Sequence, residues 1–139
     1  MQQRVFVYGT LLQGERNHHW MQGARLLGPA RTAPRFRLWS LGSYPVLCFD
    51  GRQSIRGEVY QLSATHLRSL DILEECPRYY LRCRIPTRYG PAWIYYQPQP
   101  PQHARALPGG DWRRRVSRPL TRQGFAGVSA VQGRRLDLA

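Results

Sequence analysis

An acidic residue near the end of a short helical segment is the strongest candidate for chemistry in this 139-residue chain. Residues 63–75 read S-A-T-H-L-R-S-L-D-I-L-E-E. Ser63 is a natural N-cap for a helix, and the proline two residues beyond the segment ends it. At about 100° per residue, Glu74 projects within about 20° of Leu67, at the centre of the apolar face. Glu75 lies about 80° from Leu67 and is predicted to lean toward solvent.

A carboxylate that points into an apolar core is costly unless it is paired, protonated or used in catalysis. Burial disfavours its ionised form, and Asp71, one turn earlier, is expected to disfavour that form further by like-charge repulsion. A carboxyl group tuned in this way can act as general base and general acid near neutral pH. The periodicity is equally compatible with a Glu74 that only satisfies a buried backbone N–H or an arginine.

A second candidate site follows the first apolar segment. Residues 4–8 alternate as a β-strand does, and the chain then runs G-T-L-L-Q-G-E-R-N-H-H. Gly9 and Gly14 have the G-x-x-x-x-G spacing of a phosphate-binding loop. Glu15 and Arg16, however, stand where such a loop needs Lys followed by Ser or Thr. Nucleotide hydrolysis is therefore not expected, whereas binding of an anion by backbone N–H groups stays open.

Composition argues against several classes of protein. The chain is 42% hydrophobic and has no run of about 18 apolar residues, so no membrane-spanning helix is expected. Its N-terminus lacks a signal pattern, which favours a cytoplasmic location. The formal charge is +13, but all 21 basic residues are arginines, as a GC-rich coding bias would produce. They are scattered and accompany no RNA- or DNA-binding motif, so we expect no specific nucleic-acid partner and no membrane partner.

Metal, disulfide and cysteine chemistry are not expected either. Cys48, Cys76 and Cys83 form neither an even set nor a C-x-x-C motif. His18 and His19 are adjacent on a predicted helix that begins at Asn17, so they point to different sides and cannot hold one ion together. We predict no metal site and no bound cofactor.

The pattern of short strands with two helices predicts a mixed α/β (α+β) fold around a curved sheet or small barrel. Glu58, in an alternating strand, is interpreted as structural and in a solvated pair with Arg56.

The composition changes after Trp112, so we predict a domain over 1–112 and an arginine-rich extension over 113–139. Phe125 and Val128 are predicted to dock that extension. Further strands are expected near 25–32, 35–40, 45–49 and 54–62, and a hairpin from 79–87 with 92–97.

Five groups of residues, in order along the chain, resemble the gamma-glutamylcyclotransferase-like family. They are Y-G-T-L with the later N-H-H, then S-Y-P-V-L, G-E-V-Y, L-D-I-L-E-E-C-P-R-Y-Y-L-R and A-W-I-Y-Y, together spanning residues 4–112. The likeness is greatest to small bacterial members and to gamma-glutamylamine cyclotransferases. It implies a small β-barrel of about six to seven strands flanked by short helices.

The resemblance also implies roles for individual residues. The family's glutamate for proton transfer falls on Glu74. Tyr80 and Arg82 match a Y-x-R motif, where Tyr80 lines the pocket or packs in the core and Arg82 lines the pocket or forms a surface ion pair. The loop that binds the glutamyl group through its backbone corresponds to Tyr8, Gly9, Thr10 and Leu11.

The implied activity is a cofactor-independent cyclisation of a small γ-glutamyl substrate. The α-amine of the substrate attacks its own γ-carbonyl, and 5-oxoproline and an amine or amino acid are released. Three alternatives remain at this point: a catalytically silent metabolite-binding module of the same fold, a basic nucleic-acid-binding adaptor, and a related acyl- or amine-handling enzyme. The sequence leaves open the leaving amine and the choice between monomer and homodimer.

Overall fold

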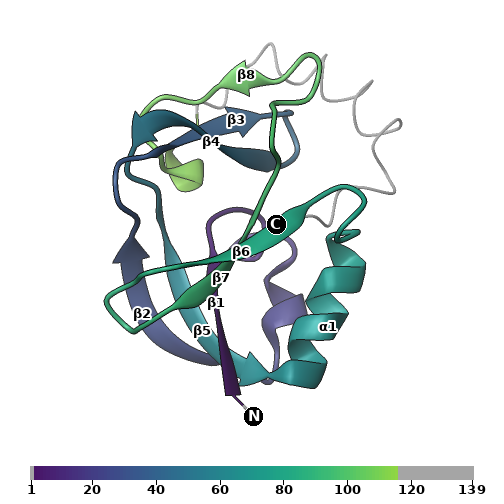
Figure 1. Cartoon of the computed structure of the whole chain (residues 1–139). Coiled ribbons are helices and arrows are strands. Elements are labelled where there is room, and N and C mark those ends of the chain that lie inside the picture. Colours follow the sequence, from purple (N-terminus) through teal and green to yellow (C-terminus); the bar gives the residue numbers. More distant parts are fainter. Residues whose placement is uncertain (1, 116–139) are drawn as a thin grey trace.

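The computed structural model of the chain describes residues 2–115, which form a five-stranded sheet, a three-stranded sheet, one α-helix and two 3-10 turns (Figure 1). The helical segments are η1 (His18–Met21), α1 (Ala64–Leu73) and η2 (Trp112–Arg114). The strands are β1 (Gln2–Val7), β2 (Arg25–Arg31), β3 (Phe36–Ser40), β4 (Pro45–Gln53), β5 (Arg56–Ser63), β6 (Leu81–Ile85), β7 (Ala92–Tyr96) and β8 (Arg105–Ala106).

The larger sheet has the order β2-β5-β1-β7-β6, and its centre is the core of the protein. β1 pairs antiparallel with β5 and parallel with β7, so it is covered on both edges. The last three residues of β1, Val5 to Val7, are completely buried, as expected for a central strand. The predicted hairpin is confirmed, because β6 and β7 pair antiparallel from Leu81 with Tyr96 to Ile85 with Ala92.

The described strands do not close into a barrel, so that part of the fold prediction is not confirmed. A barrel needs a continuous hydrogen-bonded ladder around the sheet. In residues 2–115, β2 and β6 form the outer strands of the larger sheet, and β4-β3-β8 form a separate one above it (Figure 1). β4 and β5 follow one another in the chain but lie in different sheets, which interrupts the ladder. The α+β class itself is confirmed.

The helix α1 begins where the sequence predicts it and lies against β1 and β5 (Figure 1). The Ser63 hydroxyl oxygen accepts a hydrogen bond from the His66 N–H at 3.0 Å, which satisfies one of the open donors of the first turn. Leu67 and Leu70 are buried, which confirms the predicted apolar face. Because α1 is anchored at its start and along this face, its last turn is held at a fixed place over the sheet.

The predicted extension falls mostly outside the described residues. Phe125 and Val128, and hence the predicted docking, lie there, and the boundary at Trp112 stays a prediction. Within residues 2–115, Arg113 and Arg115 form ion pairs with the body of the protein, so contacts continue past that boundary. None of the helices in this part of the chain is long and apolar enough to span a membrane.

Candidate active site

Glu74 lies at the end of α1 and is completely buried. Its backbone keeps a helical conformation, with φ −81° and ψ −2°, and its N–H donates to the Leu70 carbonyl at 2.8 Å. The prediction that this side chain faces the core is therefore confirmed. Its role in proton transfer stays a prediction.

The next residue, Glu75, leaves the helix. Its φ is +54°, in the left-handed region that favours glycine. The Glu75 N–H donates to the Ile72 carbonyl at 3.1 Å and the Cys76 N–H to the Asp71 carbonyl at 2.9 Å, a Schellman end. The helical projection does not apply to Glu75, because the residue lies outside the helix, and Glu75 is half-buried whereas Glu74 is fully buried. The turn separates the two neighbouring glutamates in direction and in environment.

Three buried tyrosines surround the position of Glu74. Tyr8 directly follows β1, Tyr80 precedes β6, and Tyr95 lies in β7; all three are fully buried. Burial raises the pKa of the Tyr8 hydroxyl well above its usual value, and the negative charge of Glu74 raises it further. Burial is also the main cause of the raised pKa of Tyr80 and of Tyr95, with Glu74 again contributing. All three hydroxyls therefore stay protonated at neutral pH and can donate hydrogen bonds.

Hydrogen bonds from the tyrosine hydroxyls connect the segments around Glu74. The Tyr8 hydroxyl donates to the Tyr95 carbonyl at 2.7 Å, which joins the end of β1 to β7. The Tyr80 hydroxyl donates to the Pro45 carbonyl at 2.6 Å, which joins the segment after α1 to β4. Tyr80 thus packs in the core and interacts with Glu74, and its role in lining a pocket stays a prediction.

Asp71, one turn before Glu74, is paired with an arginine and a tyrosine. Arg82 binds its carboxylate in a bidentate manner, with N–O distances of 2.7 and 2.9 Å. The Tyr95 hydroxyl donates to the same carboxylate at 2.7 Å. The Arg82 guanidinium also lies over the Trp93 ring, 4.1 Å from its centroid. The charge of Asp71 is therefore balanced by Arg82.

The loop after β1 is fixed by the asparagine and histidine that follow it. The Asn17 side chain donates to the Thr10 hydroxyl oxygen at 3.1 Å, and the Asn17 N–H donates to the Thr10 carbonyl at 3.0 Å. His18 contacts the Leu11 carbonyl through its Nδ1 at 2.9 Å. Asn17 therefore holds the loop instead of capping a helix, since η1 is only a 3-10 turn without a side-chain cap.

The same loop is held from its other side by Glu58. Gln13 donates its N–H to Glu58 Oε1 at 3.1 Å, and the Tyr60 hydroxyl donates to the same oxygen at 3.0 Å. Arg113 donates to Glu58 Oε2 at 2.9 Å and to the Gln13 carbonyl at 2.5 Å. The predicted solvated pair with Arg56 is wrong: Glu58 is buried, and its partner comes from η2. The backbone of Gln13 is thereby held at both its N–H and its C=O.

The residues of this loop are buried, and two of their backbone N–H groups have no backbone acceptor among residues 2–115. Tyr8, Gly9, Thr10 and Leu11 are all buried. Among residues 2–115, the N–H groups of Gly9 and Leu11 donate to no backbone acceptor. Buried backbone N–H groups are almost always paired, so such donors are suited to a ligand with negative oxygen atoms.

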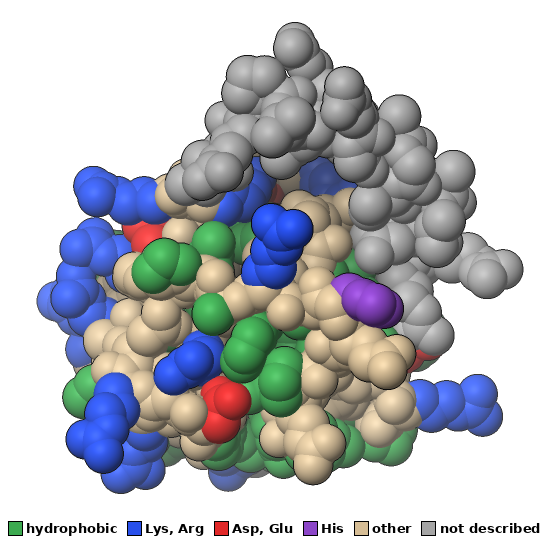
Figure 2. Space-filling view, turned by 90° about the horizontal axis from the view of Figure 1, so that it is seen from above, with side chains coloured by type: hydrophobic (Ala, Val, Ile, Leu, Met, Phe, Trp, Pro, Cys, Tyr) green, Lys and Arg blue, Asp and Glu red, His purple; other side chains and the backbone are tan. Residues whose placement is uncertain are grey.

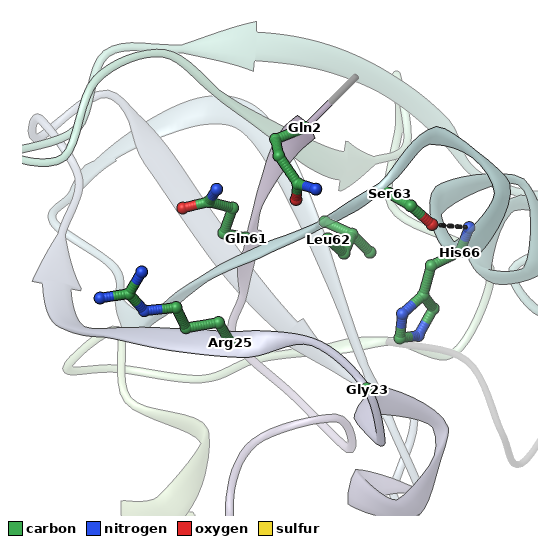
Figure 3. Close-up of a pocket in the computed structure, with 7 residues that line it drawn as sticks. All are labelled: Gln2, Gly23, Arg25, Gln61, Leu62, Ser63 and His66. Atoms are coloured by element: carbon green, nitrogen blue, oxygen red, sulfur yellow. Dashed lines mark hydrogen bonds between the residues drawn. The ribbon is translucent and has the colours of Figure 1, made fainter.

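Two hollows found elsewhere on the surface are not lined by Glu74. One, of about 350 Å³, lies at the start of α1, the opposite end of the helix from Glu74. Figure 3 shows Arg25 and Gln61 on adjacent strands at this hollow, with His66 at the helix start. The other hollow lies beside η2. No group of three or more His, Cys, Asp or Glu side chains in the described part of the chain could hold a metal ion.

Sequence reasoning missed Tyr95 and Tyr79 as neighbours of the site. Tyr95 escaped notice because β7 is buried on both faces, so its sequence does not alternate. The Tyr79 hydroxyl lies 2.5 Å from the Tyr44 hydroxyl and its ring packs edge-on against Tyr80. The contact to Tyr44, 35 positions away, has no local sequence signal.

Comparison with known proteins gives the family. A match to the family described as gamma-glutamyl cyclotransferase, AIG2-like, covers residues 5–114. A Vibrio cholerae protein whose name provisionally calls it a gamma-glutamylcyclotransferase is 46% identical over 116 residues, 84% of this chain and the whole of that protein. The Escherichia coli gamma-glutamylcyclotransferase family protein YtfP is 38% identical over 109 residues, 78% of this chain and 95% of that protein.

Solved structures also match this chain. The solution NMR structure of Escherichia coli ytfP has a TM-score of 0.65 at 39% identity, covering 80% of this chain and 96% of that one. A crystal structure of a Pyrococcus horikoshii protein has a TM-score of 0.70 at 22% identity, covering 90% and 97%, and shows the fold alone. The chain belongs to the gamma-glutamyl cyclotransferase, AIG2-like family, as the order of its sequence motifs predicted.

Proposed function

We propose that this protein is a γ-glutamyl cyclotransferase that converts a γ-glutamyl amine or peptide into 5-oxoproline and a free amine, with Glu74 as general base and acid. The observation that carries the proposal is the complete burial of Glu74 beside protonated tyrosine hydroxyls, at the end of an anchored helix. Burial disfavours the ionised form of a carboxyl group, and perturbed carboxyl groups of this kind are concentrated at active sites, where they serve as acids and bases. Membership of the family supports the same type of reaction.

The proposed reaction is intramolecular and needs no cofactor. The α-amine nitrogen of the substrate forms a bond to its own γ-carbon, and the bond from that carbon to the leaving nitrogen breaks. The α-ammonium group loses two protons in all, and the leaving nitrogen gains two. Glu74 carries one of them from the attacking to the leaving nitrogen, and the other is exchanged with solvent.

The loop from Tyr8 to Leu11 would bind the glutamyl part of the substrate. The N–H groups of Gly9 and Leu11 are the donors that we propose for negative oxygen atoms of the substrate and of the tetrahedral intermediate. Asn17 and the Glu58–Arg113 pair hold this loop rigid, which favours the folded geometry that ring closure requires. Tyr80 would border the bound substrate.

The test is a screen of γ-glutamyl amines and γ-glutamyl dipeptides for release of 5-oxoproline by the purified full-length protein. The proposal predicts catalytic release from at least one class, without added metal or cofactor, and the preferred class identifies the leaving amine. Saturable binding of these compounds without product would instead favour the metabolite-binding module. We keep the cytoplasm as the predicted location.

A further inference from the structure

A hollow that Glu74 does not line has the features of a second binding site. It lies between β2, β5 and η2 and has a volume of about 480 Å³. Sites for small molecules usually measure about 300–1,000 Å³. Leu12, Ala30 and Gly57 are among the residues that line it. The arginines that line it are Arg31, Arg56, Arg88 and Arg113.

Two of these arginines face each other directly. Arg31 and Arg56 are opposite partners in the antiparallel pairing of β2 with β5, so their side chains emerge on the same face of the sheet. Like charges at directly opposite positions destabilise a sheet. Neither guanidinium forms an ion pair or hydrogen bond with residues 2–115. An anion bound between them would remove this repulsion.

The acidic side chains at the hollow are already engaged. Glu58 Oε2 binds Arg113 at 2.9 Å. Asp111 caps η2 by accepting from the Arg113 N–H at 3.0 Å, and its other oxygen lies 3.8 Å from Arg114. Among the described residues at the hollow, therefore, no carboxylate balances Arg31 or Arg56.

The rest of the chain offers little negative charge. The sequence has 21 arginines against eight acidic residues, and beyond residue 115 its only acidic side chain is Asp137. In the view of Figure 2, arginine side chains project at several places and few acidic side chains lie among them. The counter-charge for this hollow is therefore expected to come from another molecule.

We propose that the hollow binds the phosphate groups of a small phosphorylated molecule. Planar guanidinium groups bind phosphate oxygens in pairs of parallel hydrogen bonds, which suits Arg31 and Arg56 on one face with Arg88 beside them. The volume exceeds that of a single phosphate, so a diphosphate or triphosphate fits better.

The test is calorimetric titration of the full-length protein with inorganic phosphate, pyrophosphate and ATP at fixed ionic strength. Binding of one equivalent is expected, tighter for pyrophosphate or ATP than for phosphate. The variant R31Q/R56Q is expected to weaken binding by at least about tenfold, since it removes two charge-assisted contacts. The control R68Q/R105Q removes two exposed arginines that do not line the hollow and is expected to leave the affinity unchanged.

Thermal unfolding tests whether R31Q/R56Q loses binding only because it is less stable. Without ligand, R31Q/R56Q is expected to melt no lower than the wild type, because a repulsive cross-strand pair is lost. Pyrophosphate is expected to raise the melting temperature of the wild type and of the control but not of R31Q/R56Q. Equal weakening in both double variants, or binding that never saturates, would overturn the proposal and leave ordinary adhesion of polyanions to a basic surface.

Discussion

Replacing Arg113 by glutamine tests whether the ion pair with Glu58 holds the substrate loop. The pair spans 55 positions and joins η2 to β5 at 2.9 Å, and Arg113 also binds the Gln13 carbonyl. Arg114 is the matched control. It is next in the chain and 83% exposed, and it lies 3.8 Å from Asp111.

The magnitude follows from the exposure of the two partners. Breaking a fully buried ion pair by removing one partner costs about 3–5 kcal/mol. The Glu58 side chain is 8% exposed but that of Arg113 is 41% exposed, so solvent screening reduces the loss. The remaining donors from Gln13 and Tyr60 reduce it further. We expect Arg113→Gln to cost about 1–2 kcal/mol and Arg114→Gln less than about 0.5 kcal/mol.

The assay is thermal unfolding of the two full-length variants, combined with kinetics of 5-oxoproline release. The melting temperature should fall by about 3–8 °C for Arg113→Gln and by less than about 2 °C for Arg114→Gln. The double variant E58Q/R113Q should lose less than the sum of the two single variants, because no buried charge is then left unpaired. Equal melting temperatures for the two arginine variants would refute the reasoning. If Arg113→Gln lowers the melting temperature but leaves KM unchanged, the ion pair contributes to stability and does not position the substrate loop.

Three further predictions concern the helix end and the buried hydroxyl and thiol groups. Glu75→Gly should be more stable to denaturant than Glu75→Ala by about 1 kcal/mol, because both lose the side chain but only glycine relieves the positive φ; equal stability would contradict the helix-end geometry. Burial raises the pKa of the Cys48 thiol to about 12, so its alkylation by iodoacetamide at pH 8 should be about 10³-fold slower than in the unfolded chain, and fast labelling would contradict this. Because the pKa of Tyr8, Tyr80 and Tyr95 is raised above 10, their contribution to stability is complete below pH 10 and is lost as the pH rises beyond it, by about 1.4 kcal/mol per pH unit for each. Ionisation of these three tyrosines, followed at 295 nm, should therefore coincide with unfolding, whereas their ionisation near pH 10 in a folded protein would be inconsistent with their burial.

Local patterns were sufficient for the helix and for its buried acid. Ser63 caps α1 and Glu74 faces inward because both depend on spacing within a few residues, which the sequence displays directly. The direction of Glu75 could not be read in this way. A helical projection assumes that the helix continues, and the left-handed turn at Glu75 breaks that assumption.

Long-range contacts were beyond the reach of the sequence. Glu58 has an arginine two positions away on its own strand, yet its partner is Arg113, brought to it by the return of the chain in η2. The barrel was expected from the number of short strands, but the separation of the two sheets depends on which strands pair, and the strand pattern does not specify that.

The most direct test of the account compares 5-oxoproline release by the wild type, Glu74→Gln and Glu75→Gln on the best substrate from the screen. If Glu74 transfers the proton, Glu74→Gln should remain folded and lose about 10²–10⁴-fold in kcat, whereas Glu75→Gln should stay close to the wild type. Comparable activity in all three proteins, or a larger loss in Glu75→Gln than in Glu74→Gln, would contradict the assignment of Glu74 as the general base and acid.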